Sequence, residues 1–503
     1  MADEFSGIAG TPEPSEPSEP SEPPAGDAAS DTHQGGQGGQ DGQGDEGWSD
    51  VPRYVVGALL GGTLGAVAIA AITTVIKEVL AVVSRQDTWV IITLPVLALA
   101  AATFVLHVIG CDESAVRRAP QPPAPSRQGR QGGRRLWYVP RIPLAWRTFP
   151  SDVARADLTG DVVASAGVEE RFPWRQAPLR ALAIVITVGL GAPMGTESPA
   201  AHLGTAGGSW LGQSRPRLRR MLRGAAIAGG AAGVSVLMGV SLIGTAFILE
   251  LGRRRQVPLR PARVAAALVG GVVGWLVNIG LGLNLIRLIT PKVAPDSLFQ
   301  IIETCLYVGI FSGLLTTVSG VAIYRVKGWT ASPVVRLVVG AAVMLVATLT
   351  VLFVADRRSA VGPGGGSILW AEGPGIDSPA WLLLLVAALR ATATTAAVAA
   401  GGCGGIFVPF LAIGDLAGRS FAPHLGISGD LAGASGAASG IAGGYRLPVT
   451  AVVMVIGIGG PALAMTTSIG CVLVASVVGV YATVALDHLH HRWTVAATDS
   501  RGP

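Results

Sequence analysis

This sequence of 503 residues has little charge, few aromatic residues and few cysteines. Charged side chains make up 14% of the chain and aromatic ones 6%, whereas half of all residues are hydrophobic. So little charge and so many apolar residues are not typical of a water-soluble domain. The composition therefore excludes an ordinary soluble protein and predicts a polytopic membrane protein.

Cysteine is scarce, and its spacing fits neither a metal site nor a disulfide framework. The four cysteines are Cys111, Cys305, Cys403 and Cys471. They lie far apart along the chain, in or beside apolar segments, so the spacing of a zinc site is absent. We expect structural cysteines and no cofactor.

Long apolar runs recur along most of the chain, and each is long enough to cross a bilayer as a helix of about 17–25 residues. They lie near residues 54–83, 88–110, 177–195, 224–251, 264–289, 299–325, 333–354, 380–400 and 447–485. The fold class predicted is an all-α polytopic membrane protein embedded in a lipid bilayer.

The two ends of the chain lack apolar periodicity. Residues 1–50 are rich in Pro, Gly, Ser and Gln and carry 12 acidic residues but no Lys or Arg. This composition predicts a disordered tail, and the absence of a basic start and an apolar core argues against a signal peptide. Residues 486–503 are predicted to be a short C-terminal tail.

Basic residues gather between the second and third apolar runs, in a loop over residues 111–150. The loop contains Arg117, Arg118, Arg127, Arg130, Arg134, Arg135, Arg141 and Arg147. Short basic loops tend to stay in the cytoplasm, so we expect this loop and the N-terminus to be cytoplasmic at the cell membrane. Nucleic-acid binding is not expected, because these arginines flank predicted membrane segments.

Two glycine- and proline-rich zones interrupt the apolar helices, one over residues 160–210 and one over residues 401–450. Paired interruptions in two halves of a membrane protein indicate a transport site formed by broken helices. We therefore divide the membrane domain into a first half, residues 51–295, and a second half, residues 296–485.

The first zone contains the sequence GTESP, with Gly195, Glu197 and Pro199. Proline is favoured in the first turn of a helix, so a helix is predicted to begin near Glu197. A carboxylate at bilayer depth costs about 2.5–3.5 kcal/mol and usually marks an ion or proton pathway. Burial disfavours the charged carboxylate while the positive helix end favours it, so Glu197 is predicted to exchange a proton and to compete with a mobile anion. The alternative is a helix-capping Glu at a membrane face.

The second zone contains GGIFVPF, which has the same features without a carboxylate. Gly405 precedes a helix start predicted by Pro409, and the backbone N–H groups of Ile406 and Phe407 are free to face an anion. A third break, GGYRLPVT at residues 443–450, also precedes an apolar helix.

These motifs resemble those of the CLC family of chloride channels and proton-coupled anion exchangers. GTESP resembles the family's GREGP motif, GGIFVP its GxFxP motif and YRLPVTAVVMVI its RAPLTG stretch. GPGGGSIL at residues 362–369 and FILE at residues 247–250 resemble further family motifs in the family's order. The resemblance covers residues 54–485.

The resemblance implies an inverted repeat of tilted and broken helices and a homodimer with one anion pathway in each subunit. It implies that Glu197 is the gating glutamate and that Ile406 and Phe407 offer N–H groups to chloride or another small anion. Tyr481 is the candidate for the family's anion-coordinating tyrosine, with interfacial anchoring as its alternative role. Gly195, Pro199, Gly405 and Pro409 would form the backbone of the pathway.

The chain departs from the family pattern at three places. The motif with the anion-binding serine matches only SAGVE, which places Ala166 at the serine position and Ser165 one residue early. The inner glutamate of proton-coupled members falls on Leu251, and Thr196 replaces the arginine of GREGP. Fluoride-exporting members also depart at the serine and the inner glutamate, so a fluoride/proton antiporter is the alternative. Channel or exchanger, and chloride, fluoride or nitrate, stay open.

An enzyme is not expected, but one enzymatic alternative has a sequence basis. The stretches GASG and AHLG, with Ser435 and His202, resemble motifs of rhomboid intramembrane proteases. In those enzymes the serine precedes the histidine along the chain, whereas here the order is reversed. A small-residue helix that packs closely is the better explanation of Ser435.

Overall fold

The computed structural model describes residues 51–118, 177–214, 224–254, 259–283, 297–459 and 466–499, together with Trp174 and Leu222. The chain divides into one compact unit of Gly47–Thr483 and a second unit of Met1–Glu46 with Val484–Pro503. The first unit contains the whole helical membrane domain up to the middle of the last helix. Ser165 and Ala166, the N-terminal tail and most of the basic loop lie outside the described residues.

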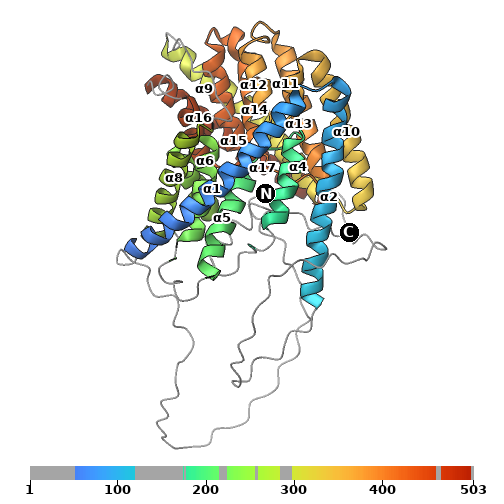
Figure 1. The fold of residues 1–503 in the computed structure, drawn as a ribbon. Helices are drawn as coiled ribbons and strands as arrows, with labels where there is room; N and C mark the ends of the chain where they lie inside the picture. The colour runs from blue at the N-terminus through green and yellow to red at the C-terminus, as the bar shows by residue number, and fades with distance from the viewer. Residues whose placement is uncertain are drawn as a thin grey trace, which may run out of the picture. The chain divides into compact units, whose positions relative to one another are not determined.

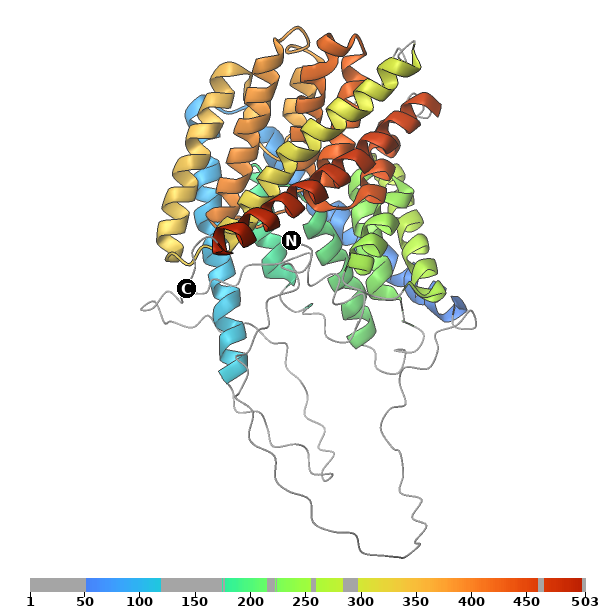
Figure 2. The same ribbon diagram turned by 180° about the vertical axis from the view of Figure 1, so that it is seen from behind.

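Every regular element within the described ranges is a helix (Figures 1 and 2). The helices of the first half are α1 (Val51–Ser84), α2 (Thr88–Arg118), α4 (Ala177–Gly189), α5 (Glu197–Ser214), α6 (Ala225–Met238), α7 (Ser241–Arg254) and α8 (Pro261–Leu281). Those of the second half are α9 (Leu298–Lys327), α10 (Pro333–Val354), α11 (Arg357–Ala360), α12 (Gly365–Glu372), α13 (Ala380–Ala399), α14 (Phe407–Leu425), α15 (Gly429–Tyr445), α16 (Pro448–Gly459) and α17 (Thr466–Asp499).

Seven of the described helices are long and apolar enough to cross a membrane, which confirms the prediction of a multi-pass membrane protein. Three of the predicted spans are shorter or broken. The run 177–195 is helical only to Gly189, and the run 447–485 is divided between α16 and α17. The run 224–251 forms two helices because Gly239 takes a left-handed conformation, with φ of 69°, and its N–H closes α6 on the carbonyl of Ser235.

The two halves repeat the same break in the same geometry. After α4 the chain turns at Gly191 with φ of 92°, and after α13 it turns at Gly401 with φ of 93°. The N–H of Gly191 binds the carbonyl of Val188, and the N–H of Gly401 binds that of Val398, both at 3.1 Å. A short non-helical stretch with one bridge residue then leads into α5 in one half and α14 in the other. The broken helices that the glycine- and proline-rich zones predict are therefore present in both halves.

The helices around the two breaks also pack in pairs. α6 packs on α5 and α1, and α15 packs on α14 and α9. In both pairs glycine faces backbone, with Gly204 of α5 against Gly229 of α6 and Gly414 of α14 against Gly436 of α15. A side chain at any of these glycines would collide with the opposite backbone, so small residues allow the helices to approach this closely.

One buried arginine fastens α14 to two neighbouring helices. Arg419 donates from Nε to Asp415 at 2.8 Å, from one terminal nitrogen to Glu372 of α12 at 2.9 Å, and from the other to Asp430 of α15 at 2.9 Å. The Arg419 side chain is 6% exposed. The network holds the helix whose N-terminus forms half of the site described below.

Replacing Arg419 with methionine is expected to destabilise the protein strongly. The substitution leaves three carboxylates, two of them fully buried, without their cation, and breaking a buried ion pair in this way costs about 3–5 kcal/mol. A thermal unfolding midpoint measured by tryptophan fluorescence in detergent checks this. The matched control is Lys327→Met at the exposed end of α9. Its unfolding midpoint is expected to stay within a degree or two of that of the unmodified protein. An equal decrease of the midpoint in both variants would contradict the role of Arg419.

Candidate functional site

Two helix N-termini meet in the middle of the membrane domain. α5 begins at Glu197 and α14 at Phe407, with Ile406 as the residue before it. Pro199 and Pro409 are both the third residue of their helices, where the missing N–H costs no hydrogen bond. Both helix starts lie where the sequence predicts them.

A pair of backbone hydrogen bonds joins the two breaks. The N–H of Gly195 donates to the carbonyl of Gly405 at 2.7 Å, and the N–H of Gly405 donates to the carbonyl of Gly195 at 2.6 Å. The two residues form an isolated antiparallel bridge. Gly195 and Gly405 hold matching places in the two halves, so the bridge joins the halves at equivalent positions.

Glu197 lies against this bridge and is 2% exposed. Its carboxylate packs against Gly195 and Gly405, and a Cβ atom at Gly405 would lie 3.0 Å from Oε2. The backbone of Val408, in the first turn of α14, also interacts with the carboxylate. Oε2 has no hydrogen-bond partner among the described residues. The carboxylate of one broken helix therefore occupies the anion-attracting end of the other.

The tyrosine nearest to this site is Tyr445, at the end of α15, and not Tyr481. The hydroxyl of Tyr445 lies 3.4 Å from the backbone nitrogen of Ile406 and 3.4 Å from Oγ of Ser198. It therefore joins the two helix starts from a third helix. The Tyr481 side chain on α17 is 72% exposed, so the structure corrects the assignment of Tyr481 to the anion site and favours its alternative role as an exposed anchor.

The sequence contained a signal for Tyr445, in the break GGYRLPVT. This break marks a helix start at Pro448, but the tyrosine before it belongs to the end of the preceding helix. Arg446 takes a left-handed conformation with φ of 57° and closes α15, so the chain turns sharply between Tyr445 and α16. The fold then packs α15 along α14, which brings Tyr445 to the α14 N-terminus.

Aromatic rings pack around the start of α14. The ring of Phe407 meets that of Tyr445 edge-on at 5.3 Å and that of Phe247, on α7, at 5.8 Å. The ring of Phe410 meets that of Tyr445 at 5.7 Å. These contacts place Tyr445 in one orientation, with its hydroxyl at the helix starts.

A buried positive charge lies beneath the loop that leads to α5. The guanidinium of Arg390, on α13, donates to the backbone carbonyls of Ser359, Ala360 and Gly362. The N–H of Gly362 in turn binds the carbonyl of Gly191 at 2.9 Å. These partners are neutral, so Arg390 contributes a positive potential close to the loop that contains Gly195.

The acidic residue at the end of α7, Glu250, contacts the start of α16. Glu250 accepts hydrogen bonds from the N–H groups of Val449 and Thr450 at 3.1 and 2.8 Å, and from the Thr450 hydroxyl at 2.7 Å. Its carboxylate therefore caps α16. Leu251, where the family's inner glutamate falls, is a buried apolar residue.

The structure gives the protease alternative no support. His202, on α5, pairs through Nε2 with Arg180 at 3.0 Å. The hydroxyl of Ser435, on α15, donates to the sulfur of Cys471 at 3.3 Å. Neither side chain has the other as a partner, although a serine nucleophile needs its base within hydrogen-bond reach.

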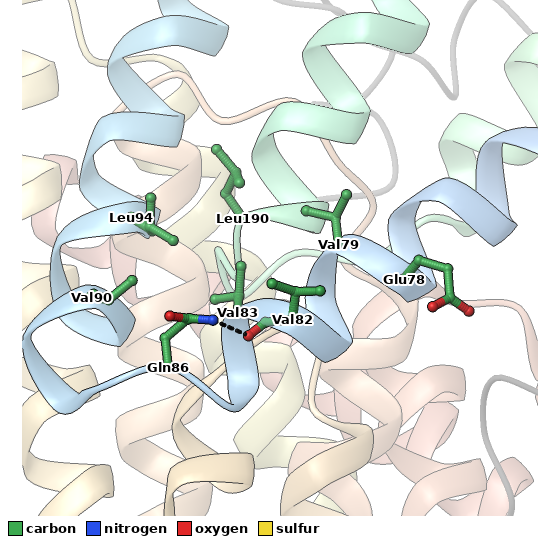
Figure 3. A pocket seen from close by; sticks show the side chains of 8 residues that line it. All are labelled: Glu78, Val79, Val82, Val83, Gln86, Val90, Leu94 and Leu190. Carbon is green, nitrogen blue, oxygen red and sulfur yellow. Dashed lines mark hydrogen bonds between the residues drawn. The ribbon is translucent and has the colours of Figure 1, made fainter.

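A separate pocket opens at the turn between α1 and α2 (Figure 3). Its volume is about 500 Å³, and its lining is almost entirely apolar, with Glu78 and Gln86 as the exceptions. The residues that line it are Glu78, Val79, Val82, Val83, Gln86, Val90, Leu94 and Leu190. Such a lining does not suit a small anion, so the helix starts at Glu197 and Phe407 form the candidate site.

Comparison with protein families matches residues 153–480 to the model described as "Voltage gated chloride channel". The chain is 27% identical over 336 residues to the "Chloride/fluoride channel protein" of Pseudomonas syringae pv. tomato, which covers 64% of this chain and 71% of that protein. It is 25% identical over 312 residues to the "H(+)/Cl(-) exchange transporter ClcA" of Yersinia pestis, which covers 58% of this chain and 62% of that protein. The match to ClcA thus spans less than two thirds of its length.

Two solved structures share the fold. A CLC-type fluoride/proton antiporter superposes with a TM-score of 0.64 at 17% identity, over 87% of this chain and 96% of that one. A slow cyanobacterial Cl⁻/H⁺ antiporter superposes with a TM-score of 0.62 at 19% identity, over 86% of this chain and 95% of that one. These likenesses agree with the inverted repeat of broken helices.

Replacing Gly195 with alanine is expected to move the Glu197 carboxylate from its place between the helix starts. The new methyl group would collide with Oε2, and the flexible glutamate side chain yields more easily than the hydrogen-bonded backbone. A density map of the variant, by crystallography or electron cryo-microscopy, checks the position. The control is Gly212→Ala, within α5, where nothing lies near the Cβ position. A carboxylate that stays in place in both variants would contradict the packing described.

Proposed function

The chain belongs to the voltage-gated chloride channel family, and from this premise we propose that it transports small inorganic anions, chloride first, across a membrane through a pathway gated by Glu197. One observation carries the proposal. The buried carboxylate of Glu197 lies at the N-terminal end of α14, a position that suits an anion. The protein is then a transporter or channel rather than an enzyme.

The gating follows from competition between the carboxylate and the anion. Charged Glu197 fills the end of α14 and leaves no room for a second negative charge. When the carboxylate takes up a proton, the N–H groups at the helix start lose their anionic partner and attract a mobile anion instead. Each proton that Glu197 binds therefore opens the site, which couples anion access to pH.

The anion is proposed to lie among groups from two helices, α14 and α15. The N–H groups of Ile406 and Phe407 come from the start of α14, and the hydroxyl of Tyr445 comes from α15. Gly195, Pro199, Gly405 and Pro409 shape the backbone around it. Ser165 and Ala166 stay proposed contributors from the segment before α4, in keeping with the family resemblance.

Three further features are proposed from the family resemblance and the charge pattern. The protein forms a homodimer with one pathway per subunit. The N-terminal tail and the basic loop after α2 face the cytoplasm, because basic loops are retained there. The two halves, residues 51–295 and 296–485, together form one pathway.

Fluoride/proton antiport is the second candidate function, and two observations favour it. Leu251 and Ala166 replace the inner glutamate and the serine of the chloride-coupled pattern. The similar proteins include a chloride/fluoride channel protein and a fluoride/proton antiporter. Glu197 has the same gating role in both candidates, so only the ion differs.

Reconstitution in liposomes with simultaneous recording of chloride, fluoride and proton movement tests the function. Chloride flux well above fluoride flux supports the first candidate, and the reverse ratio supports the second. Uphill proton movement driven by an anion gradient establishes exchange, whereas anion flux without it establishes a channel. Liposomes that pass neither anion faster than empty ones overturn the proposed function.

Replacing Glu197 with glutamine is expected to abolish the pH dependence of transport and to leave passive anion flux. In the unmodified protein the flux rises as the pH falls, by up to about tenfold per pH unit, because one proton controls the gate. Flux in liposomes between pH 5 and 8 measures this. Glu78→Gln, on the exposed surface of α1, is the control that retains the pH dependence; full pH dependence in the Glu197 variant would refute the gate.

Replacing Tyr445 with phenylalanine is expected to weaken anion binding about tenfold or more. The change removes one hydroxyl from the helix starts and keeps the ring, and a hydrogen bond to a charged group contributes about 1.5–3 kcal/mol. Isothermal titration of the purified protein with chloride and fluoride measures the affinity. Tyr481→Phe removes an exposed hydroxyl from α17 and is expected to change nothing; an effect at Tyr481 with none at Tyr445 would reverse the assignment.

A further inference from the structure

Two free thiols face each other across helices that are far apart in the sequence. Cys305, on α9, and Cys471, on α17, have their sulfur atoms 3.3 Å apart. Both are buried, with exposed fractions of 2% and 0%. They form a small apolar cluster with Leu431, and Ile301 packs against this cluster. The transport pathway proposed above uses neither thiol.

The backbone of the two helices holds these thiols in place. One turn further along α9, a Cβ atom at Gly309 would lie 3.1 Å from the carbonyl oxygen of Ala475 on α17. Another turn on, a Cβ atom at Gly313 would lie 2.8 Å from Cα of Gly479. The helices therefore touch through glycine on the same face that carries the thiols. Figure 2 shows α9 and α17 running side by side.

The hydrogen bonds distinguish the two sulfur atoms. The sulfur of Cys471 accepts from the Cys305 thiol at 3.3 Å and from the Ser435 hydroxyl, on α15, at 3.3 Å. Two donors stabilise negative charge on Cys471, and the thiolate is the reactive form of cysteine. Cys305 is the hydrogen-bond donor, so its thiol proton points toward the sulfur of Cys471. Cys471 is thus the nucleophile and Cys305 the partner that resolves the reaction.

The distance between the two sulfur atoms allows a disulfide to form without rearrangement of the helices. Closing 3.3 Å to the roughly 2.05 Å of a disulfide moves the two sulfur atoms together by about 1.3 Å, which small side-chain rotations supply. Both cysteines lie within the first turns of their helices. α9 and α10 form a hairpin, so the start of α9 and the end of α10 lie on the same side of the membrane domain. Arg357, just after α10, contacts Thr88, at the start of α2, at 3.5 Å. The start of α9 therefore lies on the same side as the α1–α2 turn.

With the basic loop in the cytoplasm, that side faces away from the cytoplasm. Disulfides persist in such oxidising surroundings. The pair therefore lies in the half of the membrane domain closer to external oxidants. Its burial restricts access to small, uncharged oxidants that partition into protein and lipid.

We propose that Cys305 and Cys471 form an oxidation site at which a peroxide links α9 to α17 through a disulfide. The Cys471 thiolate attacks one oxygen of the peroxide, gives a sulfenic acid and releases hydroxide or alkoxide. The Cys305 sulfur then attacks the sulfenic sulfur, the S–S bond forms and the second oxygen leaves as water. Two thiols lose two electrons and two protons, and one peroxide is reduced to two molecules of water or to water and an alcohol.

The link would tie together two helices that both contact α15. α15 packs on α9, and its Ser439 donates to the carbonyl of Gly309 on α9. A Cβ atom at Gly479 of α17 would lie 2.9 Å from the carbonyl oxygen of the same Ser439. The disulfide closes a long loop of chain, because the two cysteines are 166 positions apart, so it raises the thermal unfolding midpoint.

The test uses the full chain in liposomes with Cys111→Ser as the background. After hydrogen peroxide treatment, the protein is denatured, labelled with maleimide, digested and analysed by mass spectrometry. The expected result is a linked pair of peptides containing Cys305 and Cys471, loss of label at both, and reversal by dithiothreitol. The thermal unfolding midpoint of the oxidised protein is expected to rise by several degrees.

Four variants identify the pair and the nucleophile. Cys305→Ser and Cys471→Ser lose the linked peptide and the rise in midpoint, whereas Cys403→Ser keeps both. Ser435→Ala keeps the link but slows its formation several-fold, because Cys471 loses one donor. Full labelling of both cysteines after oxidation, or a sulfinic acid at Cys471 without a link, overturns the proposal. Both results are measured on the background protein, so they do not depend on whether a variant folds.

Discussion

The architecture of the site depends on one pair of backbone hydrogen bonds, between Gly195 and Gly405. Inside a membrane a broken helix exposes N–H and carbonyl groups that water does not satisfy. Here each break satisfies the other, and the two glycines allow the backbones to meet without side chains between them. The bridge sets the distance between the starts of α5 and α14, and so the place where a carboxylate or an anion fits.

Around this bridge the chain distributes its few charges with distinct roles. Arg419 joins three carboxylates and fastens α14, Glu250 caps α16, and Arg390 is held by carbonyl oxygens below the loop to α5. Each of these groups has its partners among neighbouring helices. Glu197 differs from the carboxylates around Arg419, because no cation among the described residues pairs with its carboxylate, which is buried beside a positive helix end. That combination makes it the residue best suited to exchange a proton for an anion.

Much of the site could be predicted because glycine and proline restrict the backbone locally. GTESP and GGIFVP each mark a break and a helix start from a few adjacent residues, and the structure has both helix starts at the expected residues. Tyr445 could not be identified in the same way. Its hydroxyl reaches Ile406 only because α15 packs along α14 and the chain turns at Arg446. Tyr481 has an equally favourable sequence context and is exposed on α17.

By itself the sequence determined the membrane environment, the two helix breaks and the carboxylate at the first of them, because apolar length, glycine, proline and charge act over short stretches of chain. Only the tertiary structure decided which distant residues meet. It joined Gly195 to Gly405, brought Tyr445 to the site in place of Tyr481, and set Cys305 against Cys471. Such contacts depend on the packing of whole helices, which no local pattern specifies.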